Sequence, residues 1–157
     1  MSKRLEQGGR LVDRNKSLNF TFDTNPLEGF EGDTLASALL ASGKTLVNRS
    51  YKYHRPRGIM SSGAEEPNAL VNMGAGNRFE PNQRTTTTEV FDGLTATSQN
   101  HWPSLEFDVG AINNNVPRLL PAGFYYKTFM KPQWAWKHLF EPIIRQSAGL
   151  GSAPKEA

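Results

Sequence analysis

The residues of this chain best suited to chemistry lie in one stretch, Ser50 to Val71. Its first half alternates basic and aromatic side chains, and its second half is a loop of small residues that ends in the apolar run 69–71. Basic side chains that lead into a tight loop can bind an anion, because they donate charge-assisted hydrogen bonds to it. The candidates for contact with an anion or with an acidic protein surface are Arg49, Lys52, His54, Arg55 and Arg57.

The basic run has an ordinary alternative, which is a solvated face or a set of ion pairs within the chain. Arg57 and Gly58 form its most specific part, because Gly58 permits close backbone approach and arginine forms bidentate pairs with carboxylates. We expect them to hold the loop or a subunit contact. His54 lies far in sequence from the other histidines, without metal-ligand spacing, so we expect a structural histidine.

Two adjacent carboxylates, Glu65 and Glu66, follow in the loop. Adjacent loop side chains usually diverge, so we expect solvated carboxylates rather than an acid–base pair. A second hypothesis is that Glu66 pairs with a nearby arginine and fills a vacant site, since such bonds are charge-assisted.

Composition predicts one domain with extensions, because 157 residues with 37% hydrophobic side chains can bury a core. The net charge of +3 is mild for a nucleic-acid binder. The chain has no cysteine, which excludes disulfides and thiolate metal sites. No apolar run approaches the roughly 20 residues of a membrane span. The N-terminus lacks the apolar core of a signal peptide. We therefore expect a soluble, cytoplasmic protein without a membrane contact.

The elements that position the loop follow from periodicity, which predicts an α+β domain over residues 17–99. Alternation predicts a strand over 17–23, and a turn at Asn25-Pro26 leads to a returning strand over 27–30. Asp33 is the expected N-cap of a helix that ends at Gly43. The apolar face of that helix is expected to comprise Leu35, Ala36, Leu39 and Leu40.

Further strands are expected after the loop. The short apolar run predicts one over 69–73, and β-branched residues predict another over 85–91. Asp92-Gly93 is typical of a hairpin turn to a partner strand over 94–97.

The two ends of the chain have a different texture. Residues 1–16 form a polar arm, which we expect to be ordered only against a partner. Residues 100–157 are broken by proline and rich in aromatic side chains, so they are expected to wrap on a larger body. Two short helices are expected there, over 133–140 and 143–148, with Pro142 at the joint. The aromatic side chains from 124 to 140 can stack on a base or flavin, but such residues more often anchor an interface.

Four blocks of this sequence resemble the N-terminal region of the alpha subunit of heterotetrameric bacterial sarcosine oxidase. They occur in the order expected for that family and cover most of the chain. The blocks are Phe30 to Ala41, Tyr51 to Gly58 (Tyr-Lys-Tyr-His-Arg-Pro-Arg-Gly), Pro121 to Phe129 and Ile144 to Gly151.

Related amine-oxidising flavoenzymes carry a two-iron ferredoxin-like domain at this place, with a β-grasp fold. The resemblance thus implies a β-grasp domain here, and the order of the expected elements suits it. The cluster cysteines of those relatives align with Ser61, Glu66 and Ala69 and, for the fourth ligand, with a position near Thr86. Two-iron clusters need thiolate ligands, so the resemblance implies a ferredoxin-like scaffold without its cluster.

The resemblance also implies a function for the whole complex, which is oxidative demethylation of sarcosine to glycine. It implies NAD on the alpha subunit, FAD and FMN in the complex, and partners in the rest of alpha and in the beta, gamma and delta subunits. We expect these 157 residues to be architectural, without catalytic or cofactor-binding residues of their own, and to stop before the nucleotide-binding domain.

Two alternatives remain open. A free-standing module of interleaved basic and aromatic residues can bind single-stranded nucleic acid through stacking and phosphate contact. A true two-iron protein is the second alternative, and a colourless purified protein would exclude it.

Overall fold

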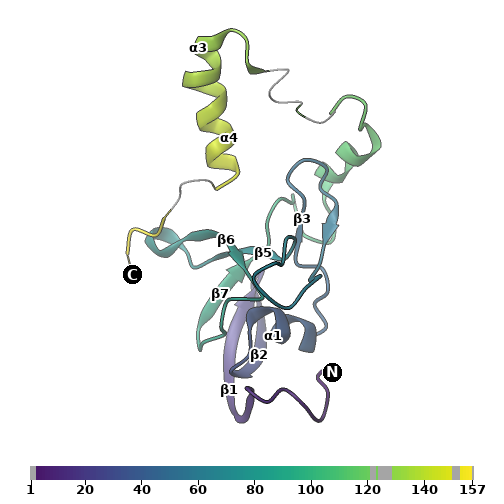
Figure 1. Cartoon of the computed structure of the whole chain (residues 1–157), viewed down its shortest axis with the longest axis vertical. Coiled ribbons are helices and arrows are strands. Elements are labelled where there is room, and N and C mark those ends of the chain that lie inside the picture. The colour runs from purple at the N-terminus through teal and green to yellow at the C-terminus, as the bar shows by residue number, and fades with distance from the viewer. Residues whose placement is uncertain (1–2, 121–122, 124–128, 150–152, 157) are drawn as a thin grey trace.

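The computed structural model describes residues 3–120, 123, 129–149 and 153–156. Its centre is a mixed five-stranded sheet with the strand order β2-β1-β7-β5-β6 (Figure 1). The strands are β1 (Asp13–Phe22), β2 (Asn25–Glu31), β5 (Leu70–Met73), β6 (Glu80–Arg84) and β7 (Leu94–Thr97). Together with one packed helix they make an α+β, ferredoxin-like fold, as the sequence predicts.

A tight hairpin joins β1 to β2, but its turn lies earlier than the sequence suggests. Asp23 and Thr24 occupy it with φ values of 48° and 66°, and β2 already begins at Asn25. Such left-handed pairs match the twist of the two strands. The first strand begins at Asp13, so part of the predicted polar arm belongs to the sheet.

The start of the helix α1 (Leu35–Ala41) corrects the prediction that Asp33 is its N-cap. The cap is Thr34, whose Oγ1 accepts a hydrogen bond from the Ser37 N–H at 3.2 Å. Asp33 is fully buried and accepts hydrogen bonds from the Phe30 N–H and the Ser37 hydroxyl. Arg4 pairs with the same carboxylate, so the N-terminal arm contacts its own domain.

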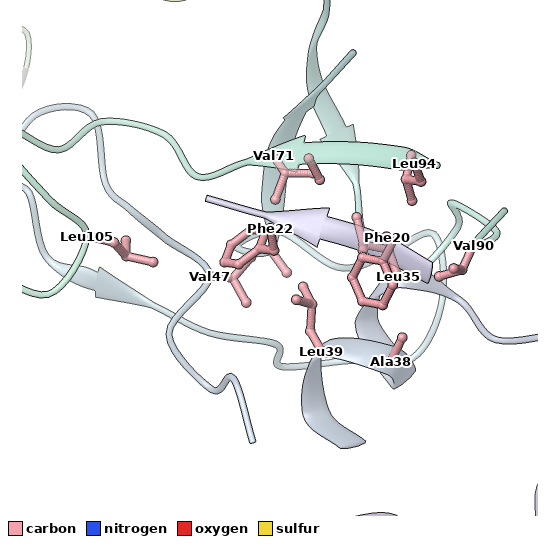
Figure 2. Close-up of a cluster of buried hydrophobic side chains, with 12 residues drawn as sticks. Phe20, Phe22, Leu35, Ala38, Leu39, Val47, Val71, Val90, Leu94 and Leu105 are labelled. Atoms are coloured by element: carbon pink, nitrogen blue, oxygen red, sulfur yellow. The ribbon is translucent and has the colours of Figure 1, made fainter. Parts of the chain in front are cut away.

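The hydrophobic core lies between α1 and the sheet (Figure 2). Phe20 and Phe22 of β1 point toward the helix and are almost completely buried, as the alternation predicts. On the helix the packed face includes Ala38, whereas the predicted core residue Leu40 is 43% exposed. Leu105 also belongs to this core, so the packing of the domain continues past residue 99.

The predicted strand over 85–91 is wrong, because the strand β6 ends at Arg84. The Thr88 hydroxyl and the N–H groups of Thr87 and Thr88 donate to the Arg84 carbonyl, which makes a turn. Local hydroxyl bonds of this kind compete with a β ladder. Consequently the turn at Gly93 does not form the predicted hairpin, and β7 instead pairs parallel to β1 and antiparallel to β5.

A second, two-stranded sheet carries the basic run. It consists of β3 (Asn48–Arg49) and β4 (Pro56–Arg57), paired antiparallel. The described part of the chain also includes two short 3-10 helices, η1 (Gly76–Arg78) and η2 (Val109–Asn115).

The helices predicted on either side of Pro142 form one continuous helical segment. It comprises α3 (Gln133–Ala135), the π-helical η3 (Trp136–Phe140) and α4 (Glu141–Ser147), and it stands away from the sheet in Figure 1. Proline lacks the N–H that an α-helical turn requires, and wider turns before Pro142 accommodate it. Within the described residues, none of the helices combines the length and apolar character that crossing a bilayer requires.

Candidate functional site

The loop that precedes β5 is organised around one buried carboxylate, that of Glu66, which is 1% exposed. Its Oε2 accepts hydrogen bonds from the N–H groups of Met60 at 2.7 Å and Ser61 at 2.6 Å. Its Oε1 accepts from the N–H groups of Asn68 at 2.8 Å and Ala69 at 3.1 Å. Four backbone donors thus converge on one side chain.

These donors decide the ionisation of Glu66. Burial alone raises the pKa of a carboxyl group, because it disfavours the charged form. The hydrogen bonds from the four N–H groups favour the carboxylate and outweigh burial, so the pKa of Glu66 falls to about 2. Glu66 is therefore charged throughout the physiological range of pH.

This geometry corrects both expectations for Glu66. The side chain is not solvated, and its carboxylate binds backbone N–H groups rather than an arginine. The nearby Arg84 Nε donates instead to the backbone carbonyl of Glu66, at 3.0 Å. Adjacent Glu65 is exposed, as expected.

The other three positions predicted from the cluster ligands lie on or against the same loop. Ser61 gives its N–H to Glu66, and Ala69 does the same while its side chain is completely buried. The Thr86 hydroxyl donates to the Gly63 carbonyl at 2.7 Å and ties the loop to the segment after β6. The structure thus brings the four positions together in and against one loop, in which Ser61 and Ala69 contact the Glu66 carboxylate directly.

Arg57 holds this loop at Asn68. The Arg57 guanidinium donates to the side-chain oxygen of Asn68, and Asn68 also donates its N–H to Glu66. Arg57 therefore supports the loop through an amide rather than through a carboxylate. Its predicted contact with an anion or a subunit stays a prediction.

Arg49 lies in the interior rather than on an accessible basic face, because it is only 7% exposed. Its Nε donates to the Leu105 carbonyl at 2.8 Å, and its two terminal nitrogens donate to the carbonyls of His54 and Glu106. The guanidinium also lies 3.6 Å from the buried carboxylate of Asp108. Arg49 thus joins the basic hairpin to the segment that follows residue 100.

His54 completes this junction as a structural histidine. Its Nδ1 lies 2.8 Å from Asp108 Oδ2. Burial raises the pKa of Asp108, but hydrogen bonds from Trp102, His54 and Gly110 outweigh burial and lower it below its usual value. Among the residues that the structure describes, no group of acidic and histidine side chains has the makings of a metal site.

Lys52 and Arg55 lie against the ring of Tyr53, at 4.9 and 4.7 Å from its centroid. The Arg55 Nε also donates to the Asn114 side chain at 2.7 Å. The Tyr53 hydroxyl donates to the Leu120 carbonyl. Much of the basic run therefore binds the chain's own segment 105–120, as the alternative of intramolecular contacts predicts.

Asp108 is a residue of this junction that the sequence patterns do not predict. This residue caps η2 by accepting from the Gly110 N–H and also accepts from the Trp102 N–H. An aspartate before a short helix is a common N-cap signal, which could have identified it. Its contacts with Arg49 and His54 are long-range and leave no local pattern.

In the predicted aromatic stripe, residues 124–126 lie outside the described residues, whereas the rings of Phe129 and Phe140 stack 4.7 Å apart.

Comparison with known proteins identifies the family of this fold. The model of the 2Fe-2S iron-sulfur cluster binding domain matches residues 15–101, which is more than half of the chain. The chain therefore belongs to this family.

Two curated relatives have the same name. The chain is 62% identical to sarcosine oxidase subunit alpha of Rhizobium meliloti (strain 1021), over 99% of this chain and 16% of that protein. It is 43% identical to sarcosine oxidase subunit alpha of Corynebacterium sp. (strain U-96), over 59% of this chain and 10% of that protein. The predicted resemblance is confirmed, and the chain spans about a sixth or less of the length of these relatives.

A solved structure is also similar. The crystal structure of L-proline dehydrogenase from P. horikoshii matches with a TM-score of 0.44 and 26% identity, over 57% of this chain and 17% of that chain.

The residues present do not fit the cluster for which the family is named. A two-iron cluster is held by cysteine thiolates, with histidines in some variants, and this chain contains no cysteine. Ser, Glu, Ala and Thr stand at the four expected ligand positions, and the Glu66 carboxylate already binds backbone donors. No chemistry of this chain is therefore assigned to an iron–sulfur cluster.

Proposed function

We propose that this chain is the N-terminal, structural and subunit-docking part of a sarcosine oxidase alpha subunit. The observation that carries the proposal is 62% identity along 99% of the chain to a protein of that name. The reaction of the whole complex would be oxidative demethylation of sarcosine to glycine, an oxidation at a CH–NH group. The role of these residues in that complex is structural rather than catalytic.

The proposal extends to the rest of the assembly. NAD, FAD and FMN belong to other parts of the complex, whose further components are the remainder of alpha and the beta, gamma and delta subunits. We place the complex in the cytoplasm. Single-stranded nucleic acid is not proposed as a partner, because Arg49 is buried and Arg55 binds Asn114.

Exposed apolar side chains support the docking role. Trp102 and Leu119, in the stretch that follows residue 100, are 69% and 71% exposed. Trp134 and Ile143 are exposed on the helical segment 133–147. Exposed apolar patches are typical of surfaces that another protein covers, and we assign these four side chains to such surfaces.

The enzyme assignment is tested by isolating the native polypeptide that carries this sequence from the organism that encodes it. We expect flavin absorbance in the purified complex and hydrogen peroxide formation that depends on sarcosine. A purified protein without flavin and without this activity would contradict the assignment.

The docking role needs a separate test in the same complex. The double variant Trp134→Ser/Ile143→Ser should reduce co-purification of the other subunits, because polar side chains remove apolar area from the contact. The matched control is Leu11→Ser, which changes a residue that is 78% exposed and lies outside both apolar segments. Equal recovery of subunits with the double variant and the control would leave the enzyme assignment intact but contradict this docking surface.

A further inference from the structure

Residues 60–69 contain a complete anion-binding arrangement whose anion is a side chain of the loop itself. Four N–H groups, those of Met60, Ser61, Asn68 and Ala69, point at the two oxygens of one carboxylate. Convergent backbone N–H groups of this kind form concave sites with a positive partial charge. Such a site attracts an anion and disfavours a cation.

The loop keeps this shape through contacts that do not involve the carboxylate. The Thr86 hydroxyl holds the Gly63 carbonyl, Arg84 holds the Glu66 carbonyl, and Arg57 holds the Asn68 side chain. The N–H groups are therefore positioned partly from outside. If the side chain of residue 66 were shortened, these donors would remain near one another without an acceptor.

Leaving these N–H groups without an acceptor is unfavourable, because a buried N–H group that loses its partner is not hydrated by water either. Asn68 and Ala69 are both buried. Water can serve some of the donors, but only an anion supplies two acceptor oxygens with a balancing charge. A small monocarboxylate would supply both the oxygens and the charge.

We propose that the loop 60–69 is a carboxylate-binding site with Glu66 as its built-in ligand, and that a free monocarboxylate can replace that ligand when the Glu66 side chain is removed. The negative charge of Glu66, rather than a metal, organises the loop. This inference is independent of the proposed function, because it concerns the loop alone.

The test uses Glu66→Ala in the native polypeptide and hydrogen exchange measured by mass spectrometry on peptides that cover residues 58–70. We expect exchange of the four N–H groups to become about tenfold faster or more, since their acceptor is lost. Sodium acetate, which has the size of the deleted group, should restore protection. Acetamide, the neutral isostere of acetate, should not restore protection, and neither should sodium chloride at the same ionic strength.

Two variants control for failed folding and for loss of any acidic residue. Glu66→Gln keeps the volume but offers a single acceptor oxygen, so we expect only part of the protection to be lost. Glu65→Ala removes the exposed neighbouring carboxylate and should change nothing in residues 58–70. Unchanged protection in both Glu66 variants would overturn the proposal, as would equal restoration of Glu66→Ala by acetate and acetamide.

Discussion

Gly58 lies so close to Thr45 that a Cβ on Gly58 would stand 2.6 Å from the Thr45 carbonyl oxygen. The backbone carbonyl of Arg57, beside it, accepts a hydrogen bond from the Val47 N–H. The close approach therefore locks the strand that leads into the Glu66 loop against the segment before β3. It agrees with the expectation that Gly58 permits close backbone contact.

Gly58→Ala should destabilise the domain by about 2 kcal/mol, because backbone must move to admit the methyl group. Gly63→Ala is the matched control. The atoms nearest to its Cβ would belong to the Glu65 carboxylate, an exposed and flexible group that can turn away. Chemical denaturation of both variants measures the difference. Equal stability of the two variants would show that the backbone at Thr45 can move away from the added methyl group without loss of stability.

The stability of the domain should depend on the ionisation of Glu66. Its pKa is about 2 in the folded chain, against an ordinary value of 4.5. The contribution is therefore complete above pH 4.5 and is lost as the pH falls through 2. The contribution is about 3 kcal/mol, which follows from the fall of the pKa of Glu66 from 4.5 to about 2.

This dependence is measured as the difference in unfolding free energy between the wild type and Glu66→Gln. The difference should shrink as the pH falls from 5 to 3, because Glu66 of the wild type binds a proton in the unfolded chain before it does so in the folded chain. The other acidic groups titrate in both proteins, so their effects cancel. About 2 kcal/mol of it should be gone by pH 3. A difference that stays constant with pH would mean that the folded-state pKa is not depressed.

The start of α1 makes a second comparison possible, between Asp33 and Thr34. Thr34→Ala removes only the helix cap and should cost about 1 kcal/mol. Asp33→Asn should cost more, about 3 kcal/mol, because it leaves the guanidinium of Arg4 beside an uncharged group in a buried place. Thermal unfolding of the two single variants gives the order. The reverse order would restore Asp33 as the main cap.

Asp108 offers the test of the junction between the basic hairpin and the segment after residue 100. Asp108→Asn should cost about 3 kcal/mol, because Arg49 would then lie buried without its counter-charge. Limited proteolysis should also cut residues 104–116 faster. Glu106→Gln, an exposed neighbour, should change stability by no more than about 0.5 kcal/mol. If both substitutions are equally mild, the charge of Asp108 does not hold the junction.

Sequence patterns predict the parts of this fold that depend on local chemistry. Alternation identifies Phe20 and Phe22 as core residues, and the turn chemistry of Gly43 matches its φ of 78°. The threonine run after β6 misleads because β propensity ignores the hydroxyl bonds to Arg84.

The candidate site was predictable only in part. The family resemblance locates the four positions around the loop, but the spacing of Glu65 and Glu66 indicates two solvated acids. Which of them turns inward depends on where four backbone N–H groups meet, and this depends on the whole loop. Asp108 escapes prediction for a similar reason, since its partner His54 is remote in sequence.

The position of β7 has a consequence for synthesis on the ribosome. β7 lies between β1 and β5, so the last strand of the sheet completes its centre. The β1–β2 hairpin can form early, but the other edge of β1 has no partner until residues 94–97 have emerged. An unpaired edge beside exposed phenylalanines invites pairing with other chains. Nascent chains that stop before Leu94 are therefore the species that most needs a chaperone.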